Sequence, residues 1–188
     1  MQMKCKKTHR PSRAGFTLIE TLAVIALVIL IVVMAMPSFF AWHMRDQVDA
    51  RSKALLSTFA YARSEALRLG SRVTVCRIDA ARVCLASGQP CADGIVDWAC
   101  GWAVFAERGG KPSLLRAQPA LAAVSIIGVQ TDMTFTPPAG QLMGAFRSFD
   151  IEPRNPSKSM QGNAWRRCIS IAAGGRARIS EGACGATS

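Results

Sequence analysis

The residues best suited to chemistry in this sequence are cations gathered near its C-terminal end. The segment 153–180 contains no acidic residue, and its six cations are Arg154, Lys158, Arg166, Arg167, Arg176 and Arg178. The chain of 188 residues has a formal net charge of +11, and five further cations lie within the first 15 residues. Without that N-terminal segment the net charge would be +6, so segment 153–180 accounts for the whole remaining excess. Such a concentration of positive charge suits a partner rich in phosphate.

Two of these cations, Arg176 and Arg178, lie in the stretch CISIAAGGRARIS. The stretch predicts two strands joined by a hairpin turn at its two glycines. Side chains alternate along a strand, so both arginines would project from one face about 6.6 Å apart, while Ala177 and Ile179 face the other way. Forked guanidinium groups at this spacing can hold neighbouring phosphates through charge-assisted hydrogen bonds. The pattern therefore favours a partner that presents neighbouring phosphates, such as a nucleic-acid backbone, with binding that is insensitive to base sequence and weakened by salt.

A second interpretation of the same hairpin needs no nucleic acid. Arginines on the edge strand of a sheet are solvated, and they discourage the addition of another strand. The sequence leaves both interpretations open. Under the DNA-binding interpretation, all six cations of segment 153–180 are candidate contact residues.

The cysteines indicate a domain that folds in an oxidising compartment. Apart from Cys5 they form an even set of six. Sequence alone does not choose among the possible pairings, but we favour Cys168 with Cys184, Cys76 with Cys84, and Cys91 with Cys100. Zinc binding is the alternative, although the intervals from Cys76 to Cys100 contain no C-x-x-C pair and no histidine lies nearby. We expect no metal and no other cofactor.

Catalysis has little support in the sequence. Beyond the first 15 residues the only histidine is His43, which follows a long apolar run and is accompanied by no nucleophile motif. No phosphate-binding glycine loop is present, since Gly109 and Gly110 are better interpreted as a hairpin turn. We therefore expect that the chain is not an enzyme.

An apolar run near the N-terminus, GFTLIETLAVIALVILIVVMAMPSFF, is long enough to carry this domain on a membrane. Residues 16–40 contain a single charge, Glu20, and as a helix they would exceed the roughly 30 Å hydrocarbon thickness of a bilayer. The basic segment 1–15 should stay cytoplasmic, which sends the rest of the chain to the other side. No ordinary signal cleavage site follows the run, whereas cleavage after Gly15 would leave the helix on the mature protein. A carboxylate in a lipid-facing helix costs about 2.5 to 3.5 kcal/mol, so Glu20 should have a partner.

The motif GFTLIE, with its basic leader, apolar helix and Pro37, resembles the class III signal of type IV pilins and pseudopilins. The resemblance implies that a prepilin peptidase removes residues 1–15 by cleaving after Gly15 and then N-methylates Phe16. It also implies that Glu20 neutralises the N-terminal amine of a neighbouring subunit in a filament. Residues 16–40 would then be first a transmembrane helix and later part of the filament core. An ordinary signal-anchor with a tolerated glutamate is the alternative.

Beyond Pro37 the pattern predicts that the helix continues over 41–70 and packs on a β-rich head, 71–188. Gly70 should end the helix, whose apolar residues recur at helical spacing: Val48, Leu55, Phe59, Ala62, Ala66 and Leu69. Short β-like runs follow at 72–78, 101–107, 123–129, 133–137 and within 165–180. A long helix packed on a mostly antiparallel sheet or sandwich is an α+β architecture of the type IV pilin kind.

The head also resembles the FimT/GspH-type minor pilins and pseudopilins. The matching stretches are ARSEALRLGSRVTVCR, GWAVF, MTFTPPAG and the final CISIAAGGRARIS with its later cysteine, whereas 79–100 looks like an insertion. The stretch GRAR matches the G-R-x-R motif with which FimT-type minor pilins of naturally competent bacteria bind DNA.

The resemblance implies a minor pilin with a periplasmic head. It would be held in the inner membrane, be assembled with other pilins into a pilus, and bind double-stranded DNA during uptake for natural transformation. A GspH-like pseudopilin of type II secretion, or a minor pilin that only primes pilus assembly, is the alternative without DNA.

Overall fold

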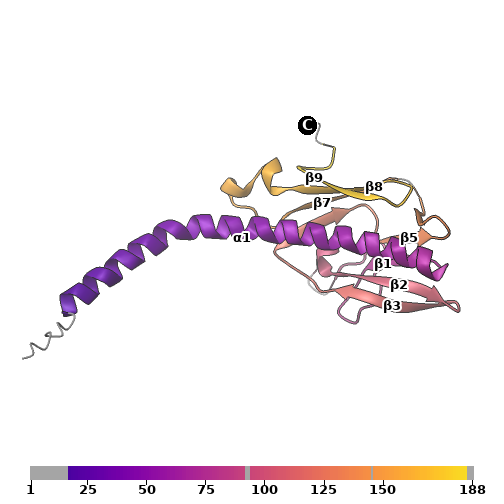
Figure 1. The fold of residues 1–188 in the computed structure, drawn as a ribbon, viewed down its shortest axis with the longest axis horizontal. Coiled ribbons are helices and arrows are strands. Elements are labelled where there is room, and N and C mark those ends of the chain that lie inside the picture. Colours follow the sequence, from indigo (N-terminus) through magenta and orange to yellow (C-terminus); the bar gives the residue numbers. More distant parts are fainter. Residues whose placement is uncertain (1–16, 92–93, 145, 186–188) are drawn as a thin grey trace, which may run out of the picture. The chain divides into compact units, whose positions relative to one another are not determined.

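The structure is a computed structural model, and it describes residues 17–91, 94–144 and 146–185. One long helix, α1 (Leu18–Leu69), precedes a β-rich region (Figure 1). The strands are β1 (Val73–Arg77), β2 (Trp102–Arg108), β3 (Lys111–Gln118), β4 (Val124–Gly128), β5 (Asp132–Thr136), β6 (Gln141–Leu142), β7 (Arg147–Pro153), β8 (Arg167–Ile171) and β9 (Ala177–Glu181). Short 3-10 helices are η1 (Trp98–Cys100), η2 (Lys158–Met160) and η3 (Asn163–Trp165). The chain divides into two units, 1–40 and 41–188, which we describe separately.

The first unit contains the apolar beginning of α1. The carbonyl oxygen of Thr17 accepts hydrogen bonds from the backbone N–H groups of Glu20, at 3.1 Å, and Thr21, at 3.2 Å, and so starts the helix. The apolar side chains that follow are exposed, and α1 is the one helix among the described residues that is long and apolar enough to cross a membrane. The leader 1–15, with Gly15 and Cys5, and the residue Phe16 lie outside the described residues.

In the second unit, α1 buries the apolar stripe that the sequence predicts. Val48, Leu55, Phe59, Ala62 and Ala66 are all at most 1% exposed, and Leu69 packs against the core that they form. The helix ends before Gly70, whose φ of +60° is the left-handed conformation that commonly terminates helices. Burial of this stripe, rather than intrinsic propensity, holds this half of the helix in place.

Two antiparallel sheets share the core with α1. The five-stranded sheet has the order β3-β2-β1-β5-β6, and the four-stranded sheet has the order β4-β7-β8-β9. In Figure 1 the C-terminal half of α1 crosses in front of them, with β7 to β9 above it and β1 to β3 below. The aromatic rings of Phe59, Trp98 and Phe149 meet at the centre, with the centroid of Phe149 5.3 Å from that of Phe59 and 5.2 Å from that of Trp98. The expected α+β fold of a long helix on antiparallel sheets is confirmed.

The unit 41–188 contains a complete core of its own. Every residue of the main core cluster lies between Val48 and Ala177, and the three disulfides of the structure also fall within the unit. The unit therefore has what a separately folding domain needs. Strands β3, β6 and β7 were not expected from the sequence.

Candidate nucleic-acid interface

The basic C-terminal hairpin is formed by β8 and β9. The backbone N–H of Gly175 donates to the carbonyl oxygen of Ala172 at 2.8 Å, and the N–H of Ala172 donates to the carbonyl oxygen of Arg176 at 3.1 Å. This pattern is a three-residue loop, Ala173 to Gly175, rather than a two-residue turn at Gly174 and Gly175. Gly175 has a φ of +76°, which is the left-handed conformation that such loops require at their last position.

The register of the hairpin turns Arg178 away from the core. Ile179 pairs with Ile169, which is fully buried, whereas Arg178 pairs with Ser170. Directly opposite residues of an antiparallel pair share a face, so Arg178 lies on the outer face of the four-stranded sheet. β9 is an edge strand of that sheet, and both Arg176 and Arg178 are exposed.

Three further contacts fix the hairpin at its ends. At the tip, the backbone N–H of Leu142 donates to the carbonyl oxygen of Ala173 at 3.0 Å, which joins the loop to the end of β6. At the base, the Cys168–Cys184 disulfide ties the segment after β9 back to β8, and the N–H of Cys184 donates to Asp150 Oδ1 at 2.8 Å. Arg176 and Arg178 therefore project from a hairpin whose tip and base are both attached to the rest of the domain.

The other cysteines are paired in the same way that we favoured from the sequence. Cys76 is bonded to Cys84 and Cys91 to Cys100, so both bridges lie in or next to the region 79–100. All six sulfur atoms are used in disulfides. In the part of the chain that the structure describes, no group of three or more His, Cys, Asp or Glu side chains is arranged to hold a metal ion.

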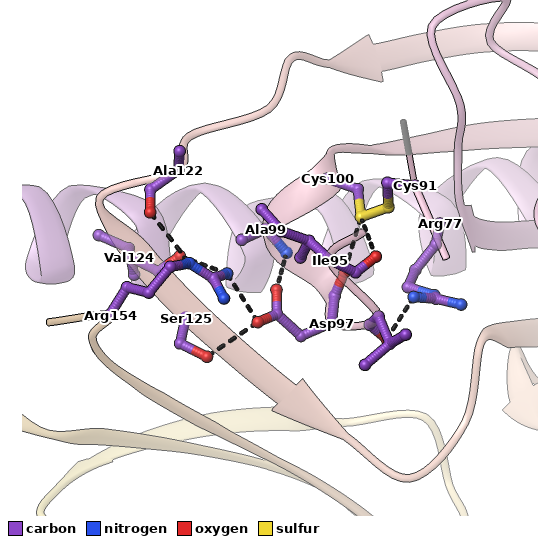
Figure 2. Close-up of polar contacts among 11 residues, drawn as sticks. Arg77, Cys91, Ile95, Asp97, Ala99, Cys100, Ala122, Val124, Ser125 and Arg154 are labelled. Carbon is purple, nitrogen blue, oxygen red and sulfur yellow. Dashed lines mark hydrogen bonds and ion pairs between the residues drawn. A yellow bond between two sulfur atoms is a disulfide. The ribbon is translucent and has the colours of Figure 1, made fainter. Parts of the chain in front are cut away.

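Arg154 is paired with a carboxylate and is not a free cation on the surface. Its Nη2 atom lies 2.7 Å from Asp97 Oδ2, and its Nε atom donates to the carbonyl oxygen of Ala122 at 3.0 Å (Figure 2). Asp97 also accepts hydrogen bonds from Ser125 Oγ, at 2.9 Å, and from the backbone N–H of Ala99, at 2.7 Å. This cluster attaches η1 to the end of the four-stranded sheet, and it neutralises Arg154.

Arg166 and Arg167 are also neutralised by carboxylates. Arg166 Nε lies 3.1 Å from Glu152 Oε2, and its Nη2 lies 3.6 Å from Asp150 Oδ1 on the outer face of β7. Arg167 points the other way, because its Nε lies 2.7 Å from Asp49 Oδ1 of α1 and its side chain is only 8% exposed. The assignment of these two residues and Arg154 to DNA contacts is therefore not supported by the geometry.

Three cations of the predicted set remain available. Lys158, Arg176 and Arg178 are exposed, and within the described ranges they form no ion pair or side-chain hydrogen bond. The predicted cluster of six therefore becomes two arginines on the hairpin and one lysine in η2.

Two arginines outside the hairpin, Arg51 and Arg77, are buried, which further lowers the positive charge of the surface. Arg77 is 1% exposed, and its guanidinium donates to the carbonyl oxygens of Val96 and of Gln89, the latter at 2.9 Å. Burial lowers the pKa of Arg77. The net charge of the chain thus overstates the charge that a polyanion would meet.

The chain is similar to proteins of one known family. The profile of the family described as "Type II transport protein GspH" matches residues 52–175, which is more than half of the chain. The chain belongs to the GspH family. The family consists of pilin-like structural proteins and is not a family of enzymes. The apolar start of α1 fits a membrane-anchored pilin.

Two solved structures share the fold of this GspH-family chain. Both are crystal structures of the type IV minor pilin FimU from Pseudomonas aeruginosa, strain PAO1. The crystal form in space group P21 has a TM-score of 0.54 and 20% sequence identity, covering 72% of this chain and 90% of that chain. The form in space group P65 has a TM-score of 0.50 and 19% identity, covering 70% and 91%. At these identities the likeness concerns the fold alone. No curated protein matches the chain.

Proposed function

We propose that this GspH-family chain is a minor pilin that binds DNA without sequence specificity through the β8–β9 hairpin, during DNA uptake for natural transformation. The observation that carries the proposal is the exposure of Arg176 and Arg178 on a braced edge hairpin, without an acid partner among the described residues. Neighbouring cations are held by carboxylates, so these two arginines are the ones that a phosphate backbone can use. Lys158 adds a third exposed positive charge.

The chemistry of the hairpin suits phosphate rather than base edges. A guanidinium group offers a planar fork of donors that matches phosphate oxygens. Contacts to phosphates alone carry no sequence information, so binding should not depend on the DNA sequence. Each neutralised phosphate releases counterions, and binding should weaken as the salt concentration rises.

The proposed maturation and assembly follow the pilin-like signal. In this proposal segment 1–15 is a leader that a prepilin peptidase removes after Gly15, and Phe16 becomes the methylated N-terminus. Residues 16–40 anchor the chain in the inner membrane and later enter the filament, while 41–70 packs on the head, 71–188, in the periplasm. Glu20, which lies exposed in the first turn of α1, pairs with the amine of a neighbouring pilin.

A mobility-shift titration of the 41–188 domain with duplex DNA tests the DNA-binding proposal. The double variant Arg176→Gln/Arg178→Gln should bind more weakly at every salt concentration, and the dependence of log affinity on log salt should become shallower by about 0.9 for each lost phosphate contact. Unchanged affinity in this variant at low salt would overturn the proposal.

The β2–β3 hairpin offers a matched control. Arg108 and Lys111 are two exposed cations that flank its glycine pair, whereas Arg176 and Arg178 follow the glycine pair of the β8–β9 hairpin. The variant Arg108→Gln/Lys111→Gln changes the net charge by the same amount. It should leave DNA binding nearly unchanged, which separates a local site from a general effect of charge.

A second candidate function is favoured by the description of the family as a type II transport protein. In that case the chain is a pseudopilin of type II secretion, with a structural function and no nucleic-acid partner. Deletion of the gene would then abolish protein secretion and leave transformation intact. The proposed function requires the opposite result.

A further inference from the structure

A groove lies between the C-terminal half of α1 and the tip of the β8–β9 hairpin. Its volume is about 380 Å³, and residues of both elements line it, among them Ala60, Arg63, Ser64 and Leu67 of the helix and Gly175 and Arg176 of the hairpin. The groove brings a helix arginine and a hairpin arginine to one hollow, although 113 positions separate them in the sequence.

Arg63 lines this groove and contacts the turn that contains Ala139 and Gly140. Its Nε atom donates to the carbonyl oxygen of Gly140, and its Nη2 atom to that of Ala139, both at 3.3 Å. A Cβ atom on Gly140 would lie 2.7 Å from Arg63 Cγ, and one on Gly175 would lie 3.3 Å from Arg63 Cδ. The side chain therefore passes close to two glycine turns. Its Nη1 atom has no hydrogen-bond partner among the residues that the structure describes.

The charge of this groove differs from that of the other cavities. Four other cavities among the described residues each have a carboxylate on their walls, which is Asp79 in one, Glu107 in two and Glu152 in the fourth. The groove beside the hairpin has two arginines on its walls and no acidic residue. Its remaining wall is largely apolar, with Ala60 and Leu67 exposed on α1. Cations beside an apolar surface suit a ligand made of alternating phosphates and sugars.

We propose that this groove is part of the DNA contact surface, with Arg63 and Arg176 binding phosphates of one strand and the intervening deoxyribose packing on Ala60 and Leu67. The inference rests on the proposed DNA-binding function. It extends that site from the exposed face of β9 onto α1, and it adds Arg63, a residue far from the G-R-x-R stretch, as a contact.

Substitution of Arg63 tests the inference directly. In the 41–188 domain, Arg63→Gln should weaken the binding of a fluorescently labelled DNA duplex roughly three- to tenfold, and the salt dependence should become shallower by about one phosphate contact. The control is Lys53→Gln, because Lys53 lies on the same helix, is exposed, forms no ion pair with any residue that the structure describes and does not line the groove. It changes the net charge equally and should leave the affinity and its salt dependence unchanged.

A second variant leaves the contacts of Arg63 in place. Ala60 is exposed on α1 and lines the groove, so Ala60→Glu adds a negative charge there without burying it. This variant should also weaken DNA binding by roughly three- to tenfold through repulsion of phosphate. The matched control is Ala81→Glu, because Ala81 is exposed in the region 79–100 and lines none of the five cavities.

Each remaining outcome has a definite meaning. If Arg176→Gln/Arg178→Gln loses affinity while Arg63→Gln and Ala60→Glu bind normally, the groove is not a DNA surface and the proposed function stands. If Arg63→Gln binds weakly with an unchanged salt dependence and Ala60→Glu binds normally, Arg63 only positions the hairpin, and the inference is wrong.

Two further outcomes concern the partner itself. If the unsubstituted domain does not bind DNA, both the inference and the proposed function fall. If the groove variants bind DNA normally but the full-length chain no longer enters filaments, the groove is a contact between subunits, and the inference is again overturned.

Discussion

Arg167 of β8 and Asp49 of α1 form an ion pair, with Nε 2.7 Å from Oδ1, that joins the basic hairpin to the helix. The cation belongs to the cluster that the sequence assigns to DNA, but its side chain is only 8% exposed. Arg167 therefore stabilises the packing of β8 on α1. The positive charge that a polyanion would meet on the hairpin comes from Arg176 and Arg178.

Removing the charge of Asp49 should destabilise the 41–188 domain. Asp49→Asn leaves the buried guanidinium of Arg167 without its close partner, which should lower the free energy of unfolding by about 2 kcal/mol. Urea denaturation measures the change. Asp46→Asn serves as the control, because Asp46 is exposed on the same helix, and it should leave the midpoint unchanged.

Asp97 should also be important for stability, because it joins η1 to β4 and to the residue that follows β7. Its carboxylate accepts from Arg154, Ser125 and the backbone of Ala99, and the side chain is 12% exposed. Asp97→Ala removes all three acceptor contacts, so we expect a loss of about 2 to 4 kcal/mol in the free energy of unfolding. An exposed carboxylate on β5, Asp132, provides the comparison. A thermal melt of Asp97→Ala that matched Asp132→Ala would contradict the assigned role.

The two glycines of the hairpin loop should respond differently to substitution. Gly175 has a φ of +76°, and a Cβ there would lie 2.2 Å from the carbonyl oxygen of Gly140, whereas a Cβ on Gly174 meets nothing within 4 Å. Gly175→Ala should therefore lower stability by at least about 1 kcal/mol, because the left-handed conformation alone costs that much for alanine. Gly174→Ala should be close to neutral. Hydrogen exchange at the N–H of Leu142, which is bonded to the loop, reports whether the tip has moved.

Glu20 should affect assembly and not folding. The residue is exposed in the first turn of α1, in the unit that precedes the domain. Glu20→Gln should leave the stability of the 41–188 domain and its DNA affinity unchanged. It should reduce recovery of the full-length chain in sheared filaments, because the carboxylate is the expected partner of a neighbouring amine. Normal filament incorporation would argue against the pilin-like role of this residue.

Local patterns were enough to predict the helix and most of the buried strands. The stripe from Val48 to Ala66 is set by helical periodicity, and β1, β2, β4 and β5 coincide with apolar runs. β3 was missed because it is a mostly exposed edge strand that contains Pro112. β7 was missed because its buried residues Phe149 and Ile151 alternate with charges that face outward.

At the candidate site, the sequence alone could not predict which cations are paired with carboxylates, because charge pairing is a property of the fold. Arg154 and Asp97 are 57 positions apart in the sequence, and segment 153–180, to which Arg154 belongs, contains no acid. Counting local charge therefore treats every arginine of the segment as free. The proximity of Arg63 to the β8–β9 hairpin could not be predicted either. Arg63 lies on α1, far from the hairpin in the sequence, and both line one groove only in the folded domain.

The disulfides bear on the order in which this domain acquires its covalent bonds. Each bridge joins one cysteine to the next one along the chain, at separations of 8, 9 and 16 residues, and no bridge encloses or crosses another. Consider a chain that enters an oxidising compartment with residue 76 first and residue 184 last. Each cysteine then meets its native partner before the next unpaired cysteine of the domain enters. Under this order of entry the native disulfides form without any rearrangement.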